Sequence, residues 1–155
     1  MDIVRVQEEV FQLSDVIDEL VRSDAGVGAV VSFLGVARDH NQGQSVQDLW
    51  LEHYPGMTES AIEAMVAKAK SRFAVLRVAV VHRVGHFKPT DPIVAVVVAG
   101  VHRTEAFDAC QFIMDYLKIH APFWKKEMTP TGAKWVDARV SDDEAAARWG
   151  IPPQA

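Results

Sequence analysis

The residue types best suited to chemistry lie in the stretch 101–127. His102 and Arg103 follow an apolar run, 93–101, which predicts a buried strand, and a helical pattern begins directly after them. A histidine and an arginine where a strand gives way to a helix can donate hydrogen bonds to a phosphate or a carboxylate. The pair is therefore a candidate anion-binding corner, although a polar strand end that faces water fits these residues equally well.

Two lysines follow this pair. Lys118 borders the apolar stripe of the expected helix, and Lys125 lies in a segment that reads as extended. A lysine near a helix C-terminus often only extends its charge into water. A partly desolvated ammonium can instead serve as a nucleophile, a general acid or an anion clamp. In an extended segment, one of Lys125 and Lys126 faces inward and the other outward. Lys118 and Lys125 could both return to the corner formed by His102 and Arg103.

Several other kinds of site are missing from the sequence. It contains no phosphate-binding glycine loop, no paired-cysteine motif and no serine nucleophile elbow. His82 and His86 are separated by a strand end and by Gly85, so a zinc pair is not expected there, and no metal site is expected elsewhere. The single cysteine, Cys110, falls on the apolar stripe of a helix and is interpreted as a buried structural thiol. If the strand that ends at His82-Arg83 is antiparallel to the next one, this second His-Arg pair lies at the opposite end of the sheet from the first.

Composition limits the kind of protein and the kind of ligand. With 155 residues, 49% of them hydrophobic and 24% charged, the chain predicts one globular domain over 1–155. One cysteine and an N-terminus without a signal-peptide pattern favour the cytoplasm, and no apolar run reaches the roughly 20 residues of a membrane-spanning helix. The net charge of −5 argues against a nucleic-acid partner, whereas residues 100–139 hold six Lys/Arg and five Asp/Glu. A locally basic site on an acidic body suits a small anion.

Hydrophobic periodicity predicts the elements that must position these residues. Strands are expected at 2–7, 29–34, 46–54, 75–84 and 93–101, helices at 14–24, 58–73 and 104–119, and a hairpin at 123–128 and 134–138. Ser14 and Thr58 are expected to cap their helices, and 46–54 is expected to pair with 29–34 across a loop at 35–45. The tail, 140–155, fits either a terminal helical turn or partial disorder. Neighbouring strand pairs among helices predict an α+β fold with an antiparallel or mixed sheet.

The chain resembles a known family through a series of short segments in the right order. They span roughly residues 28–139 and are Gly28-Ala29, Phe33-x-Gly35-x-x-Arg38, Leu51-Glu52-x-Tyr54-x-x-Met57, His82-Arg83-x-Gly85, His102-Arg103-x-x-Ala106-Phe107, Asp115-x-Leu117-Lys118, Pro122-x-Trp124-Lys125-x-Glu127 and Trp135-Val136. The ensemble is similar to the large, catalytic subunits of molybdopterin synthase, the MoaE family.

This resemblance implies a fold, a reaction and partners. The implied fold is an α/β hammerhead with an additional antiparallel sheet. The implied reaction is a sulfur transfer that converts cyclic pyranopterin monophosphate (precursor Z) into molybdopterin by inserting two dithiolene sulfurs, with no cofactor or metal. The sulfur would come from the C-terminal thiocarboxylate of a small ubiquitin-like partner subunit, whose Gly-Gly tail enters a pocket on the large subunit. The implied assembly is a heterotetramer: a homodimer of large subunits with one small subunit at each end.

The resemblance also assigns roles to residues. Lys118 and Lys125 fall on the two essential lysines of the family. The positions of the substrate pocket are taken by Arg38, His102 and Arg103, with Phe33 and Met114 as the apolar lining and Arg139 as a pocket arginine that can reach across the dimer. The residues alone leave two other functions open: a non-catalytic module that binds an anion or a ubiquitin-like tail, and a nucleotide-binding regulator, for which the chain offers no phosphate loop.

Overall fold

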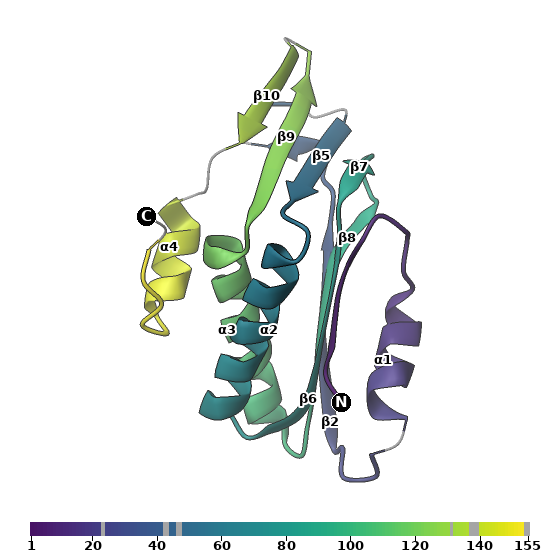
Figure 1. The fold of residues 1–155 in the computed structure, drawn as a ribbon, viewed down its shortest axis with the longest axis vertical. Coiled ribbons are helices and arrows are strands. Elements are labelled where there is room, and N and C mark those ends of the chain that lie inside the picture. Colours follow the sequence, from purple (N-terminus) through teal and green to yellow (C-terminus); the bar gives the residue numbers. More distant parts are fainter. Residues whose placement is uncertain (23, 42–43, 46–47, 131, 137–139, 154–155) are drawn as a thin grey trace.

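The computed structural model describes residues 1–22, 24–41, 44–45, 48–130, 132–136 and 140–153. Its elements (Figure 1) follow one another in this order: β1 (Ile3–Gln7), α1 (Leu13–Val21), β2 (Ala29–Val36), β3 (His40–Asn41), β4 (Gln44–Ser45), β5 (Asp48–His53), α2 (Met57–Arg72), β6 (Val75–Arg83), β7 (Gly85–Phe87), β8 (Pro92–Gly100), α3 (Arg103–His120), β9 (Phe123–Thr129), β10 (Gly132–Val136) and α4 (Val140–Ala147).

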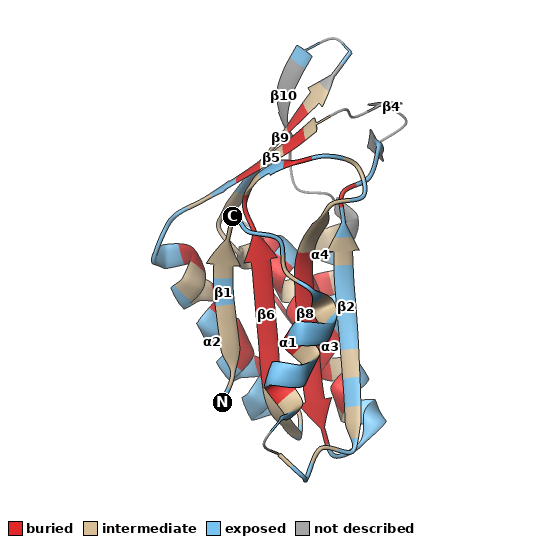
Figure 2. Ribbon diagram, turned by 90° about the vertical axis from the view of Figure 1, so that its right-hand side faces the viewer, coloured by how far each residue is buried: buried red, intermediate tan, exposed pale blue. Residues whose placement is uncertain are grey.

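The central sheet has the strand order β1-β6-β8-β2, in which β1 is parallel to β6 and the other pairs are antiparallel. Its two inner strands, β6 and β8, are buried along most of their length, whereas β1 and β2 at the edges are partly exposed (Figure 2). The inner strands are apolar on both faces because helices cover both faces. Helix α1 packs on one face through Val16 and Leu20. Helices α2 and α3 cover the other through a larger apolar cluster.

A second sheet, with the order β10-β9-β5-β7, lies at one end of the molecule, at the top of Figure 1. All of its pairs are antiparallel. The expected hairpin is therefore present as β9 and β10, and the predicted α+β class with an additional antiparallel sheet is confirmed. None of the helices in the described part of the chain is long and apolar enough to cross a bilayer.

Some local expectations were wrong. The strand expected at 46–54 does not pair with β2: it forms β5, which lies between β7 and β9 in the second sheet. Alternation along a strand reports which faces are buried but not which strand lies beside it. Short strands also interrupt two segments that were expected to be irregular, β3 and β4 within 35–45 and β7 within 85–92.

Neither expected N-cap residue occupies a cap position. Helix α1 begins at Leu13, after Gln12, so Ser14 lies inside it. Helix α2 begins after Gly56, whose N–H donates to Glu59 Oε2 at 2.6 Å. Gly56 has a φ of +86°, a left-handed conformation that glycine adopts without strain. Thr58 therefore does not cap the helix, and its hydroxyl makes the hydrogen bonds described below.

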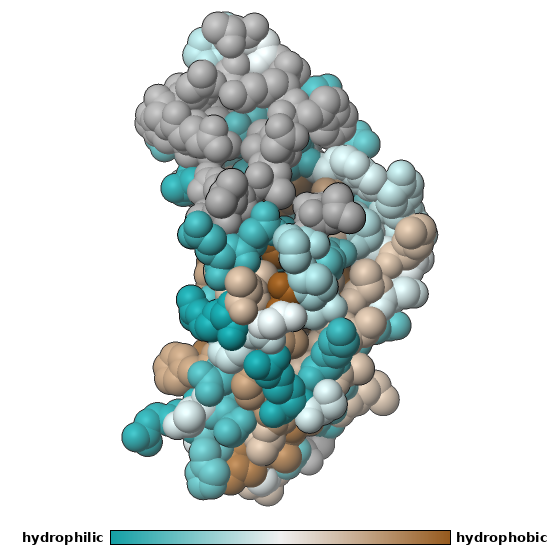
Figure 3. All heavy atoms as spheres, turned by 90° about the vertical axis from the view of Figure 1, so that its left-hand side faces the viewer, coloured by the Kyte–Doolittle hydropathy of each residue, from teal (hydrophilic) through white to brown (hydrophobic). Residues whose placement is uncertain are grey.

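The C-terminal segment packs against α3. Trp149 Nε1 donates to Asp115 Oδ2 at 2.7 Å, and Gln111 Nε2 donates to Asp115 Oδ1 at 3.0 Å. Arg72 lies over the Trp149 ring and donates to the Trp149 carbonyl at 2.6 Å, while Ile151 is buried. On this side of the molecule, apolar atoms lie recessed between hydrophilic side chains (Figure 3). The segment 140–153, which follows the second sheet, thus packs against the outer side of α3.

Replacement of Trp149 by phenylalanine tests this packing. An aromatic ring would stay, but the buried Asp115 carboxylate would lose one of the two donors that the described residues give it, so we expect the free energy of unfolding to fall by about 1–3 kcal/mol. Chemical denaturation would measure the change. A matched Trp124→Phe variant, which alters an exposed ring on β9, should change stability by less, and equal losses in the two variants would contradict the prediction.

Candidate active site

The α3–β9 corner, residues 118–125, carries the two candidate lysines. Helix α3 ends at His120, and β9 begins at Phe123 after a turn closed by hydrogen bonds from Ala121 N to Leu117 O and from Phe123 N to Ala121 O. Lys118 lies in the last turn of the helix and is exposed, and Lys125 is the third residue of the strand. Two amines of the type expected for anion chemistry therefore flank one short, hydrogen-bonded connection.

Lys125 lies on the inward face of the second sheet. Its register partner on β5 is Leu51, and Glu127, two residues further along β9, pairs with Leu49; both leucines are buried. Side chains two apart on a strand share a face, so the expectation that Lys125 and Lys126 point to opposite faces is confirmed. Lys125 Nζ lies 3.5 Å from Glu127 Oε1, and the Glu127 side chain is only 4% exposed. A buried carboxylate thus holds one end of the Lys125 side chain on this face.

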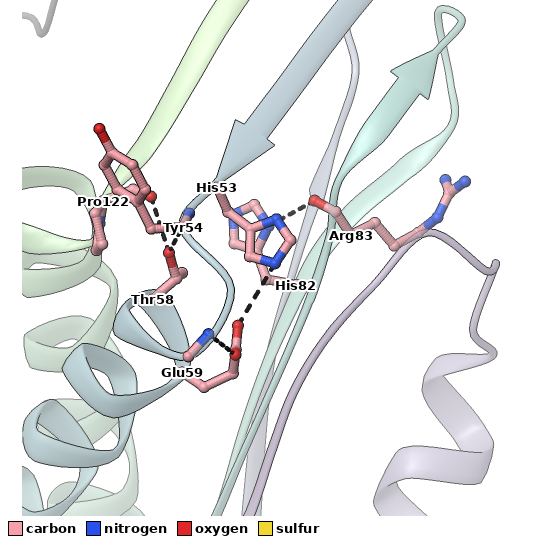
Figure 4. Close-up of polar contacts among 8 residues, drawn as sticks. His53, Tyr54, Thr58, Glu59, His82, Arg83 and Pro122 are labelled. Atoms are coloured by element: carbon pink, nitrogen blue, oxygen red, sulfur yellow. Dashed lines mark hydrogen bonds and ion pairs between the residues drawn. The ribbon is translucent and has the colours of Figure 1, made fainter.

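Thr58 anchors the α3–β9 corner to α2. Its hydroxyl donates to the Pro122 carbonyl at 3.0 Å and accepts from the backbone N–H of Tyr54 at 3.1 Å (Figure 4). The Thr58 side chain is fully buried. A single hydroxyl therefore joins the end of β5, the first turn of α2 and the turn between the lysines. Tyr54 adds an edge-on ring contact to Trp124, with centroids 4.2 Å apart.

His82 lies beneath the same corner. Its ring stacks on Phe123 with centroids 3.9 Å apart and an interplanar angle of 19°. Its Nδ1 lies 2.7 Å from the Arg83 carbonyl, and because a carbonyl can only accept, Nδ1 carries the hydrogen. Burial lowers the pKa of His82 to about 4, the hydrogen bond to Arg83 opposes this shift, and the charges of Lys118 and His53 lower the pKa further. At neutral pH the ring is uncharged.

A second histidine is close to this cluster. His53 is the last residue of β5 and the register partner of Phe123. Its Nε2 lies 3.6 Å from Glu59 Oε1, too far for a hydrogen bond (Figure 4). The other Glu59 oxygen accepts from Gly56 at the start of α2. The ends of β5 and β6 and the start of α2 thus place two imidazoles and one carboxylate next to the lysine corner.

His102 and Arg103 lie at the other end of the chain's longest helix. Arg103 begins α3 and Lys118 lies in its last turn, so about 22 Å of helix axis separates them at 1.5 Å per residue. The expectation that the lysines return to the His102–Arg103 corner is therefore wrong within a single chain. The other His-Arg pair, at the end of β6, lies at the end that carries the lysines, as expected for a strand antiparallel to β8.

The other residues expected to line the substrate pocket are Arg38, Phe33, Met114 and Arg139, and they do not all lie at the end that carries the lysines. Strand β2 runs parallel to β6, because both are antiparallel to β8, so Arg38, two residues after β2, is at the lysine end and is exposed. Met114 is buried on the inner side of α3, and Phe33 is 41% exposed on the edge strand β2. Arg139 lies outside the described residues. One described chain thus brings Arg38 to the end that holds Lys118 and Lys125, but not His102 and Arg103.

Sequence reasoning missed three buried polar residues at this site: Thr58, His82 and Glu127. Thr58 was expected to cap a helix, and His82 was treated as a strand end. The motif His82-Arg83-x-Gly85 could have indicated that His82 has a structural or functional role. Arg83 is itself buried, donates to the carbonyls of Glu8 and Pro92 at 3.0 and 2.9 Å, and lies over the Phe87 ring. Its role in this motif is to hold the strand end together.

Two further sequence expectations concern reactive groups. Cys110 is buried, and burial raises the pKa of its thiol to about 11, which confirms the structural interpretation. The described residues contain no group of three or more His, Cys, Asp or Glu side chains placed to hold a metal ion. The side chains described at the corner include ammonium groups, imidazoles and carboxylates, which can bind anions and transfer protons.

The structure defines the class of this protein as an α+β domain with an added antiparallel sheet and two candidate lysines at one corner, and comparison with known proteins identifies its family. The family model described as MoaE protein matches residues 6–120. The chain belongs to this family.

Individual relatives agree with this assignment. A molybdopterin synthase catalytic subunit from Ralstonia nicotianae is 54% identical over 151 residues, which cover 97% of this chain and 86% of the relative. The solved structure of a molybdopterin biosynthesis MoaE protein from Burkholderia ambifaria superposes with a TM-score of 0.84 at 48% identity, covering 97% of this chain and 99% of that one. A chain from the complex of subunits 1 and 2 of the molybdopterin-converting factor of Helicobacter pylori shares the fold, with a TM-score of 0.70, 19% identity, and coverage of 87% and 90%.

Proposed function

We propose that this chain catalyses sulfur transfer in molybdenum cofactor biosynthesis. It would convert cyclic pyranopterin monophosphate into molybdopterin by inserting two dithiolene sulfurs taken from the C-terminal thiocarboxylate of a small ubiquitin-like subunit. Membership of a family whose curated relatives are named molybdopterin synthase catalytic subunits supports the reaction class. The observation that carries the proposal in this chain is the α3–β9 corner, which places Lys118 and Lys125 on either side of one anchored turn.

The residues at the corner match the chemistry. The substrate phosphate and the incoming thiocarboxylate are both anions, so ammonium and guanidinium groups at Lys118, Lys125 and Arg38 would offset their charge and hold them close together. Attack of the sulfur on substrate carbon builds negative charge on oxygen, which a positioned lysine stabilises, and a lysine can also carry the proton that must move. This scheme requires no metal.

The partners follow from the same reasoning. The related fold from Helicobacter pylori was solved as a complex of two different subunits of the converting factor, which supports a small partner subunit. Because His102 and Arg103 lie a helix length away from Lys118 in one chain, we infer that a second copy supplies this pair to the pocket. The assembly would then be a homodimer with one small subunit at each end, and Arg139 a further pocket arginine.

The decisive assay mixes the purified chain with a thiocarboxylated small subunit and cyclic pyranopterin monophosphate, and then measures dithiolene product. Product formation is expected. A stable complex of the two proteins that forms no product would overturn the enzymatic proposal and leave the alternative, a module that binds a ubiquitin-like tail.

Mixing two inactive variants tests the shared pocket. Lys118→Ala and Arg103→Ala remove groups from opposite ends of α3, and each variant alone should be strongly impaired. If a second copy completes each pocket, a mixed dimer contains one intact site, so random exchange should restore about a quarter of wild-type product formation. Lys118→Ala mixed with Lys125→Ala is the matched control, because both changes fall on the same side of the pocket and no intact site can form. Equal activity in the two mixtures would rule out sharing.

A further inference from the structure

The His82-Arg83-x-Gly85 segment is one of the sequence motifs that the proposed reaction leaves unused. Its histidine is 5% exposed, yet it lies under the one turn that connects the two candidate catalytic lysines. A buried imidazole is a polar group removed from water, so it is expected to have specific partners inside the protein. His82 has such partners.

Two contacts fix the His82 ring, and one of them is made with the corner. One face of the ring stacks on Phe123, the residue that begins β9 and lies two positions before Lys125. The ring cannot turn freely, since its Nδ1–H is held by the Arg83 carbonyl at 2.7 Å. The Arg83 side chain fixes that residue in turn through two backbone carbonyls. His82 thus extends from the central sheet as a fixed support and contacts the first residue of β9, a strand of the second sheet.

Lys118 lies on the other side of the same turn. Its charge acts on the His82 ring, as does that of His53 on β5, which Glu59 on α2 faces at 3.6 Å. With Nδ1 protonated, only Nε2 of His82 can take up a proton, and the resulting imidazolium would be a buried cation.

We propose that His82 is a positioning residue for Lys118 and Lys125: its ring, fixed by Arg83 and stacked on Phe123, sets the geometry of the corner that carries both amines. This inference rests on the proposed function for its catalytic consequence but not for its structural content. Thr58 holds the turn from the other side through Pro122, whereas His82 contacts the first residue of β9.

Amine labelling of the free chain tests the positioning directly. The acetylation rates of Lys118 and Lys125 would be measured by mass spectrometry relative to Lys70, which pairs with Asp2 at the far end of the sheet. In His82→Ala we expect both relative rates to change by at least about threefold, because lysine reactivity follows its local environment. A smaller change at either lysine overturns the proposal. His82→Gln serves in its place if the alanine variant does not fold, which circular dichroism would show.

The sulfur-transfer assay adds the catalytic consequence. His82→Ala should slow single-turnover transfer by about 10- to 100-fold, the scale expected for misplacement of a reacting group by about 1 Å, with affinity for the small subunit unchanged. His82→Phe keeps a flat ring on Phe123 and should retain most of the rate. His86→Ala, which removes an exposed histidine on β7, is the control. Wild-type protein that makes no product would refute the proposed function alone, and the labelling result would still decide the role of His82.

Discussion

Replacing Lys118 by alanine is expected to slow sulfur transfer by roughly 10²- to 10⁴-fold, the range that a positioned proton-transfer group contributes. Lys118 lies in the last turn of α3, at the turn that His82 and Thr58 anchor, and it is the candidate amine whose charge acts on the buried His82. Its removal would leave the substrate and the thiocarboxylate without that ammonium group. Single-turnover formation of dithiolene product is the measurement.

Two further variants make this result specific. Lys118→Arg keeps the positive charge but cannot release a proton at neutral pH, so partial rescue by arginine would indicate an anion clamp and no rescue would indicate proton transfer. Lys70→Ala removes an exposed lysine that pairs with Asp2, and it should leave the rate unchanged. A Lys118→Ala enzyme as fast as the Lys70→Ala enzyme would remove Lys118 from the catalytic assignment.

Acidification is expected to destabilise the protein through His82. The pKa of this side chain is lowered from 6.5 to about 4 on folding, so between these pH values the unfolded chain binds a proton that the folded chain excludes. The contribution of the neutral ring is fully present above pH 6.5 and is lost as the pH falls towards 4. A shift of this size corresponds to about 3 kcal/mol in the free energy of unfolding.

The matched variant for this prediction is His82→Phe. At neutral pH the phenylalanine should cost about 1 kcal/mol, because the Arg83 carbonyl loses its donor. As the pH falls from 7 to 4.5, the wild-type protein should lose more stability than the variant, so the difference between their unfolding free energies shrinks and then reverses. Urea denaturation at several pH values would show this. Parallel pH dependence in the two proteins would contradict the assignment.

The sequence by itself determined the local structure and the chemical character of this protein. Apolar β-branched runs produced β6 and β8, helical periodicity produced α2 and α3, and the turn signals near residue 130 produced the β9–β10 hairpin. Lys118 and Lys125 were identified as the candidate amines, and the ordered motifs indicated the family. These properties are local: they depend on residue type and on spacing within a few turns of chain.

The tertiary structure decided which elements lie side by side. In the fold, β5 lies in the second sheet, and His102 and Arg103 lie a helix length away from Lys118. His82 is buried beneath Phe123, which follows it by 41 positions in the chain. Strand partners and buried stacks are selected by contacts between distant segments, and periodicity describes only the faces that such segments offer. The amines could therefore be named from the sequence, whereas the histidine that supports them could be recognised only in the fold.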